Sequence, residues 1–388
     1  MRSTGVLAWR YVSHYWGRSS ILASCIALVA FLPFAVTILV DHYQERMTRR
    51  ATETPLLVGA KGSRFDLLMN LLYFKGKLRD LISMADAEEI SHDGRAAAIP
   101  LYVHHSVKGF PVVGTSLDYF EFRHLALESG HWPLILGDAV LGATVARELG
   151  VEVGGHVISD TEKLYEISAS YPLRMRVTGV LKEAGTADDH AVFVDTKTAW
   201  IIAGIGHGHQ NVADRPDWVL NADGDNVTGN AAVVEFNEID ATNLESFHFH
   251  GGPETLPLSG IIVVPRDQKS YTIVKARVEN RSEKLQPVVP TEGVDELLDF
   301  VFQAKRFFDA NLLLVSTATF LFVTLVVLLT IRVRRRELET LFKIGASRMM
   351  VVRLLATELG IVIAAGLVTA LALAAIASEI AIQGHWLL

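Results

Sequence analysis

The chain has 388 residues, of which 50% are hydrophobic and only 20% charged, a balance too apolar for an ordinary soluble globular protein. Its single cysteine, Cys25, excludes an intrachain disulfide and with it a small disulfide-stapled secreted scaffold. The formal net charge of −7 is uneven, because residues 41–309 carry 26 basic and 39 acidic side chains. An acidic main block argues against nucleic acid as a partner.

Residues 1–20 combine arginines with tryptophans and tyrosines, which predicts an amphipathic cytoplasmic segment next to the membrane. Residues 21–40 follow as an apolar stretch long enough to cross a hydrocarbon core of about 30 Å. By the same measure, residues 310–331 and 354–378 predict a second and a third transmembrane helix. The sequence therefore predicts a protein with three transmembrane helices.

Basic flanks stay in the cytoplasm during membrane insertion, and residues 1–20 and 332–353 are the two basic segments. We therefore expect a multi-pass protein of the cytoplasmic (inner) membrane with its N-terminus inside. Residues 41–309 are then extracytoplasmic, and so is the tail at 379–388.

The block at 41–309 mixes helical and strand patterns, which predicts a large α+β domain. Helices are expected at Phe65–Phe74 and at Ala143–Leu149, where Gly150 ends the second one. The expected strands include Ile99–Val103, Arg174–Val180 and Gly260–Val264. The Gly/Asp/Asn-rich stretches Ala203–Gln210 and Asn221–Asn230 are expected to be surface loops.

Residues 295–309 have apolar side chains at helical spacing and run without a breaker into the second apolar stretch. This pattern predicts a stalk helix that continues into the membrane.

The chain contains no phosphate-cradling G-x-x-x-x-G-K-[ST] loop, no G-x-S-x-G elbow and no H-E-x-x-H motif. A hydrolase therefore has no candidate nucleophile, and we expect no catalytic residue and no cofactor. Any ATP would be bound and hydrolysed by a partner subunit.

Four histidines are candidate metal ligands, since His207 and His209 are two residues apart, as are His248 and His250. Two-residue spacing fixes neither the number nor the geometry of ligands, and a polar strand face beside a Gly-rich loop explains it equally well. We therefore predict no metal site from sequence and retain these four residues as candidates.

The basic segment at 332–353 has too few apolar residues to span a membrane, and Gly345 offers a bend in a helical pattern. It reads Arg334–Arg336, Glu337, Leu338 and then Gly345-Ala346-Ser347-Arg348. This run resembles the coupling helix of FtsX/MacB-type permeases of the ABC transporter superfamily, on which the ATPase subunit sits. An acid that opens the following membrane helix also matches, at Glu358.

The resemblance implies that this segment contacts the ATPase. Acidic Glu337 and Glu339 would pair with basic groups, and an apolar face would fill a groove. The residues expected to couple to the ATPase are Glu337, Leu338, Glu339, Leu341, Phe342, Gly345, Ala346, Ser347 and Arg348.

Thr54–Ser63, Val113–Phe120, Ala139–Gly142, Gly179–Leu181 and Ala191–Val194 resemble the MacB-like periplasmic core. This resemblance implies a membrane-proximal subdomain split around a distal inserted subdomain at about 126–254. These permeases usually have four membrane helices, whereas this sequence predicts three, so the fourth is missing or supplied elsewhere.

The resemblance implies a permease that works by mechanotransmission, as a homo- or heterodimer with a second permease copy and with ABC ATPase subunits. Its outer domain would export or extract a membrane lipid, lipoprotein, peptide or drug, with a possible extracytoplasmic adaptor. One alternative is an FtsX-like regulator that activates a cell-wall hydrolase without transport. A second alternative is a metal-binding sensor.

Overall fold

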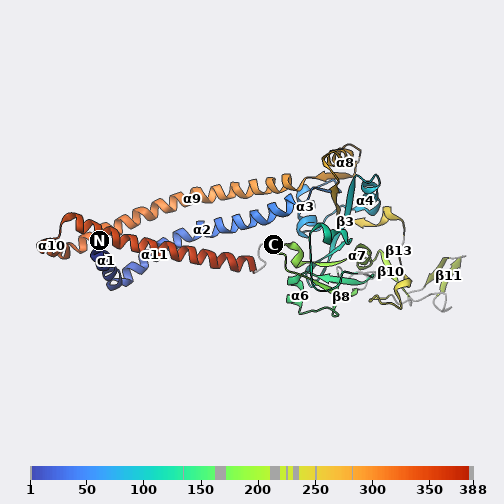
Figure 1. The fold of residues 1–388 in the computed structure, drawn as a ribbon, viewed down its shortest axis with the longest axis horizontal. Helices are drawn as coiled ribbons and strands as arrows, with labels where there is room; N and C mark the ends of the chain where they lie inside the picture. The colour runs from blue at the N-terminus through green and yellow to red at the C-terminus, as the bar shows by residue number, and fades with distance from the viewer. Residues whose placement is uncertain are drawn as a thin grey trace. The chain divides into compact units, whose positions relative to one another are not determined.

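The structure is a computed structural model that describes residues 2–133, 135–161, 172–209, 219–223, 226–229, 236–249, 251–281 and 283–383 (Figure 1). The chain divides into two compact units. The helical unit consists of Met1–Met47 and Glu296–Leu388, and the sheet unit consists of Thr48–Asp295.

Five helices supply the helical unit: α1 (Arg2–His14), α2 (Trp16–Thr52), α9 (Pro290–Val333), α10 (Arg335–Lys343) and α11 (Arg348–Gln383). Three segments in the described part of the chain are long and apolar enough to cross a membrane: Trp16–Asp41, Pro290–Val333 and Arg348–Ile380. The three apolar stretches predicted from sequence fall inside them. The stretches 295–309 and 310–331 lie in one helix, α9.

Contacts within the helical unit hold α11 against two other helices. Helix α1 packs on α11. A Cβ added at Gly366 of α11 would lie 2.9 Å from the Ala23 carbonyl oxygen and the Ile26 Cβ of α2. Because glycine has no side chain there, the backbones of α2 and α11 approach closely, as small residues allow in membrane helix packing.

The sheet unit is α+β, as expected. Its strands are β1 (Leu56–Ala60), β2 (Ile82–Ser83), β3 (Ala96–Val107), β4 (Phe110–Thr115), β5 (Leu127–Gly130), β6 (Asp138–Leu141), β7 (His156–Ile158), β8 (Arg174–Leu181), β9 (Val192–Asp195), β10 (Gly206–Gly208), β11 (Val219–Asp223), β12 (Asn226–Gly229), β13 (Phe247–Phe249), β14 (Pro257–Leu258), β15 (Gly260–Pro265) and β16 (Leu285–Val288). Its α-helices are α3 (Arg64–Tyr73), α4 (Met84–Ser91), α5 (Asp118–Phe122), α6 (Ala143–Leu149), α7 (Thr196–Ile202) and α8 (Gln268–Arg281). Short 3₁₀ helices are η1 (Ala187–His190), η4 (Leu244–Ser246) and η5 (Pro253–Thr255).

Ten strands form one sheet in the order β16-β1-β15-β3-β4-β9-β6-β8-β5, with β7 paired to β8. The pairs β4–β9 and β6–β8 are parallel and the other pairs of this sheet are antiparallel. Strand β6 is buried along its whole length, which is why it reads as an apolar run without alternation. Helix α3 packs beside β1, β3 and β15, and α7 packs on β4.

Local sequence patterns gave the correct element at several sites. Helices α3 and α6 and strands β3, β8 and β15 lie where they were predicted, and Gly150 does cap α6. Both predicted loops need correction. Gly206–Gly208 in the first forms strand β10, and the second overlaps the hairpin strands β11 and β12. Glycine and asparagine there follow the demands of strand pairing rather than their own loop preference.

Part of the expected distal subdomain at about 126–254 lies in the main sheet. Strands β5 to β9 belong to the same sheet as β1, β3 and β15, because β9 pairs in parallel with β4. Within the described residues, these strands of the inserted segment therefore extend the sheet.

Candidate functional site

The link between α9 and α11 contains the short helix α10 and a tight turn. Helix α10 ends in a Schellman-type motif, in which the Ala346 N–H donates to the Leu341 carbonyl and the Gly345 N–H to the Phe342 carbonyl, both at 3.0 Å. Gly345 has a φ of +98°, a conformation that favours glycine. The Ser347 Oγ then accepts the Met350 N–H at 3.2 Å and caps the start of α11. The Gly-Ala-Ser run thus ends one helix and starts the next.

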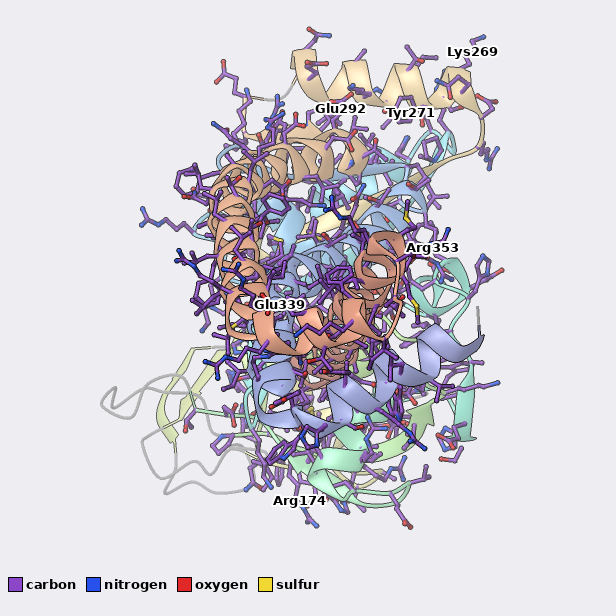
Figure 2. The ribbon with its side chains drawn as sticks, turned by 90° about the vertical axis from the view of Figure 1, so that its left-hand side faces the viewer. Arg174, Lys269, Tyr271, Glu292, Glu339 and Arg353 are labelled. Carbon is purple, nitrogen blue, oxygen red and sulfur yellow. The ribbon has the colours of Figure 1, made fainter. Side chains whose placement is uncertain are left out.

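The predicted coupling residues lie on α10 and this turn, and several side chains are exposed. Phe342 is 43% exposed and the neighbouring Ile344 is 78% exposed, whereas Leu341 is half-buried. Glu339, labelled in Figure 2, accepts a hydrogen bond from Arg335 Nε at 3.1 Å, an ion pair within α10. Ser347 and Arg348 are exposed and Ala346 is half-buried. The side chains of Glu337 and Leu338 lie outside the described residues.

Glu358 of α11 holds a buried ionic cluster at the start of α10. Arg334, the residue before α10, donates from Nη1 to Glu358 Oε2 at 2.9 Å, and Arg18 of α2 donates from Nη2 to Glu358 Oε1 at 3.1 Å. Arg334 and Glu358 are only 7% and 8% exposed. The Arg334 guanidinium also lies 4.3 Å from the ring centre of Tyr11 and 4.8 Å from that of Tyr15. One carboxylate and two aromatic faces therefore offset two cations.

A small cavity of about 50 Å³ adjoins this cluster. It is lined by residues of α2, α9 and α11, including Arg18 and Glu358. Its lining is mostly apolar, but Arg18, Ser19 and Glu358 give it polar groups, and its volume is large enough for an ordered water molecule. The sequence pointed to Glu358 as the acid of the third apolar helix, and the structure identifies its two arginine partners.

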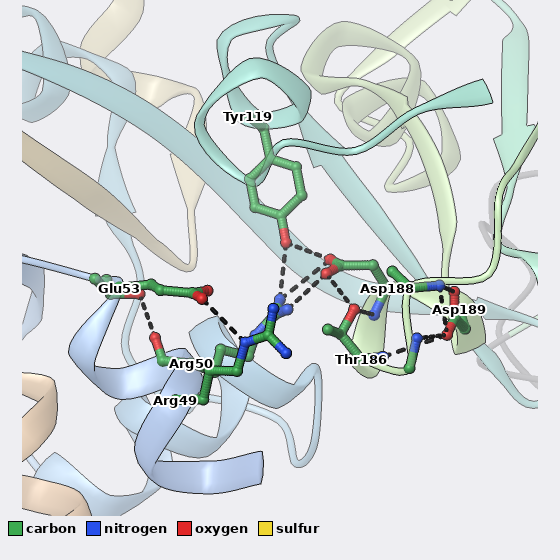
Figure 3. Close-up of polar contacts among 10 residues, drawn as sticks. Arg49, Arg50, Glu53, Tyr119, Thr186, Asp188 and Asp189 are labelled. Carbon is green, nitrogen blue, oxygen red and sulfur yellow. Dashed lines mark hydrogen bonds and ion pairs between the residues drawn. The ribbon is translucent and has the colours of Figure 1, made fainter. Parts of the chain in front are cut away.

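A second buried ionic cluster lies within the sheet unit, at the end of α2 (Figure 3). Arg50 donates from Nη1 to Asp188 Oδ2 at 2.6 Å and from Nη2 to the Tyr119 hydroxyl at 2.9 Å. The Tyr119 hydroxyl donates to Asp188 Oδ1 at 2.6 Å, and the Thr186 hydroxyl donates to Asp188 Oδ2 at 2.8 Å. Arg50 is 5% exposed and Asp188 is 1% exposed. These bonds join the last turns of α2 to α5 and η1.

The charges in this cluster shift one another's pKa. Burial alone would raise the pKa of Asp188, but the adjacent Arg50 guanidinium and the hydrogen bonds from Arg50 and Tyr119 outweigh it and hold that pKa at about 2. For Arg50, burial lowers the pKa, and Asp188 more than offsets this, so the net shift is upward. Burial raises the pKa of Tyr119, which keeps its hydroxyl available as a donor. Asp188 is therefore a carboxylate in the folded protein at any ordinary pH.

Arg123 adds a further cation beside this cluster. Its guanidinium lies 4.9 Å from the ring centre of Phe122 and 5.9 Å from that of Tyr119. None of its three side-chain nitrogens has a hydrogen-bond partner among the described residues. Burial and, second, repulsion by Arg50 lower its pKa. The sequence analysis missed the cluster of Arg50, Asp188 and Tyr119, because Arg49 and Arg50 are adjacent arginines in one basic run. Only the position of each arginine around the helix would have distinguished the buried one from the exposed one.

Three of the four candidate histidines come together in the sheet unit. His207, His209 and His248 place nitrogen atoms within 4.8 Å of one another. His250 lies outside the described residues.

Residues 19–281, more than half of the chain, match the family described as the MacB-like periplasmic core domain. Among solved structures, the chain is similar to the periplasmic region of MacB from Actinobacillus actinomycetemcomitans, with 11% identity and a TM-score of 0.36 over 64% of this chain and 92% of that one. It is also similar to the extracellular domain of the noncanonic ABC-type transporter YknZ from Gram-positive bacteria, with 11% identity and a TM-score of 0.34 over 60% of this chain and 98% of that one. A comparison with curated proteins gives no match. The resemblance seen in the sequence is confirmed by the family match, and this chain belongs to the MacB-like periplasmic core domain family as an ABC-transporter-type permease.

Proposed function

We propose that this permease transmits movement from a separate ABC ATPase subunit, which sits on α10, to the sheet unit. The sheet unit would then export or extract a lipid, lipoprotein, peptide or drug. The observation that carries this proposal is the construction of α10, which is a short helix fixed at both ends with apolar side chains exposed between them. In this proposal the α10 end of the helical unit is cytoplasmic and the sheet unit is extracytoplasmic.

The fixed ends of α10 support transmission. At one end, Arg334 is bonded to Glu358, so a push on α10 is passed to α11 through a buried ion pair. At the other end, the Gly345 turn and the Ser347 cap leave no flexible linker before α11. Because Glu358 also binds Arg18, α2 is connected to the same point. Helices α2 and α9 each run without a break into the sequence of the sheet unit.

The exposed surface of α10 suits an ATPase subunit. Phe342 and Ile344 are large apolar side chains of the kind that act as anchors in a partner's groove. Among the described residues, Glu339 forms an ion pair with the exposed Arg335 of its own helix. This interaction contributes about 0.3–0.5 kcal/mol, so a partner could replace it at little cost.

Purification of the full-length chain in detergent from its own cells tests this docking site. The double variant Leu341→Ala/Phe342→Ala should lose an ABC ATPase that copurifies in stoichiometric amount with the wild type, together with its ATP hydrolysis. Leu117→Ala, which truncates a 54% exposed leucine in the sheet unit, should retain both. An ATPase that stays bound and active on the double variant would refute the role of α10.

Transport and regulation are separated by a second assay. The purified complex is placed in vesicles containing a fluorescent phospholipid and a lipopeptide. ATP-dependent release of either one to an acceptor supports export or extraction. ATP-dependent activation of an added cell-wall hydrolase without release supports the regulator instead.

A further inference from the structure

The strands β10 and β13 form a small antiparallel pair with two chemically different faces. In this pair His207 lies opposite His248, Gly206 opposite Phe249, and Gly208 opposite Phe247. Because side chains alternate along a strand, His207 and the following His209 point to the same side. The cross-strand partner His248 shares that side. One face is therefore made of imidazoles and the other of phenylalanines over glycines.

The phenylalanine face is anchored to the protein core. A Cβ added at Gly206 would lie 2.4 Å from the Phe249 ring, and one at Gly208 would lie 2.6 Å from the Phe247 ring, so both rings lie directly over the glycine backbone. Phe249 packs edge-on against Trp200 with ring centres 6.1 Å apart, and both phenylalanines pack on the main hydrophobic cluster. The apolar face thus fixes the strand pair and sets the direction of the histidines.

The three imidazoles converge at the opposite face. Their ring centres are separated by 4.8 Å for His207 and His248, 5.1 Å for His209 and His248, and 5.6 Å for His207 and His209. All three are partly buried. His248 Nδ1 lies 3.1 Å from the Ser246 carbonyl oxygen, which can only accept, so Nδ1 carries the proton of this hydrogen bond. In the neutral imidazole the lone pair is then on Nε2. A backbone carbonyl that fixes the tautomer in this way is a common outer partner of a metal-binding histidine.

We propose that His207, His209 and His248 bind one divalent transition-metal ion, with Zn²⁺ as the ion that this ligand set fits first. Three neutral imidazoles and one open position make a tetrahedral Zn²⁺ site with Zn–N distances of about 2.0–2.1 Å. Such a site places its nitrogens roughly 3.4 Å apart, so the rings must close by up to roughly 1.4 Å from the present separation. A fourth position left to water makes the ion exchangeable, unlike a closed structural site.

The competing explanation is a polar strand face whose rings happen to stack. Packing between imidazole rings is a weak contact and needs no third ring. It predicts no metal affinity above that of scattered surface histidines. The metal proposal is independent of the ATPase-coupling proposal, because no residue of α10 or α11 takes part in it.

Full-length protein in detergent, freed of metal by a chelator, is titrated with Zn²⁺ against a chromogenic competitor. The expected result is one equivalent of tightly bound Zn²⁺, no binding of Mg²⁺ or Ca²⁺, and a tetrahedral Co²⁺ absorption spectrum. His207→Ala and His248→Ala should each weaken binding by more than the roughly 10–100-fold that loss of an outer partner costs. His92→Ala, an exposed histidine after α4, should bind as the wild type does.

The variants His207→Ala and His248→Ala change residues within the strand pair and could disturb folding. His209→Ala avoids this problem, because His209 follows the end of β10. It should weaken Zn²⁺ binding while the thermal unfolding of the metal-free protein stays unchanged. Absence of the single Zn²⁺ equivalent in the wild type overturns the proposal. Wild-type affinity in folded His209→Ala overturns it as well.

Discussion

Replacing Arg50 with methionine is the sharpest test of how the sheet unit holds the end of α2. The substitution keeps the length and the apolar stem of the side chain but removes the guanidinium. Asp188 then remains as an acid with 1% exposure and no cationic partner in this cluster's ion pair, and the donors left to its carboxyl group are the hydroxyls of Tyr119 and Thr186.

The expected loss is large because an unpaired buried charge costs far more than a surface ion pair contributes. Removal of one partner from a buried ion pair costs about 3–5 kcal/mol of unfolding free energy. For a unit of this size, each kcal/mol lowers the midpoint of thermal unfolding by about 2–4 °C. Arg50→Met should therefore lower the midpoint for the sheet unit by about 6–20 °C.

Arg49 provides a matched control one residue away. It pairs with Glu53 at 3.2 Å, but its side chain is 74% exposed. Arg49→Met should cost no more than about 0.5 kcal/mol. Thermal unfolding of the full-length variants in the same detergent measures both effects. If Arg50→Met lowers the midpoint no more than Arg49→Met does, the buried pair does not hold α2 and the reasoning fails.

The remaining predictions concern acid stability and the two ends of α10. The pKa of about 2 at Asp188 lies below its ordinary value of 3.8, so its contribution of about 2 kcal/mol is complete above about pH 4 and is lost as the pH falls toward 2. The free energy of unfolding measured from pH 2 to 5 should show this slope in the wild type. The slope should be smaller in Arg50→Met but not absent, because Asp93 and Asp160 also have lowered pKa values and titrate in both proteins. An equal slope in the two proteins would contradict the assignment. Glu358→Gln leaves Arg18 and Arg334 without their carboxylate and should lower the unfolding free energy of the helical unit by about 3 kcal/mol. Unfolding in detergent measures this loss, and the control Glu339→Gln should lose less than about 0.5 kcal/mol. Gly345→Val should lower the unfolding free energy by about 1–3 kcal/mol and speed amide hydrogen exchange in α10, because valine tolerates a φ of +98° poorly. Gly345→Asn should lower the unfolding free energy by less. Equal exchange in the two variants would remove the role of that turn.

Elements whose signals are local could be predicted from sequence. Helix α6 was predicted at Ala143–Leu149 because a short helical pattern meets Gly150 directly, and the cap is set by residues within one turn. The three long apolar stretches were found for a similar reason, since length and composition alone decide whether a helix reaches across a bilayer.

Elements that depend on distant pairing could not be predicted. Strand β9 joins β4 in parallel from far along the chain, and nothing in Val192–Asp195 encodes that partner. Strand β10 was predicted as a loop because Gly206 and Gly208 favour one, yet these glycines are what allow two phenylalanine rings to cover the strand.

The candidate sites show the same division. Glu358 could be identified because an acid in an apolar helix is costly and therefore conspicuous. Its partners Arg18 and Arg334 could not, because both lie in basic segments that topology alone explains. Histidine spacing named the metal candidates, but their convergence depends on the pairing of β10 with β13.

Helix α2 carries one member of each buried ionic cluster, Arg18 near its start and Arg50 near its end. Each arginine is bonded to an acid on a different element of its own unit, Glu358 of α11 and Asp188 of η1. Breaking the buried pair of Arg50 and Asp188 is costly, so that end of α2 resists local slippage, whereas Arg18, whose side chain is 38% exposed, forms a weaker, partly buried pair. Pro33 lies between them, where it removes one backbone hydrogen bond and makes the helix easiest to bend. Any bending of α2 during a working cycle is therefore directed to Pro33, away from the two ionic clusters.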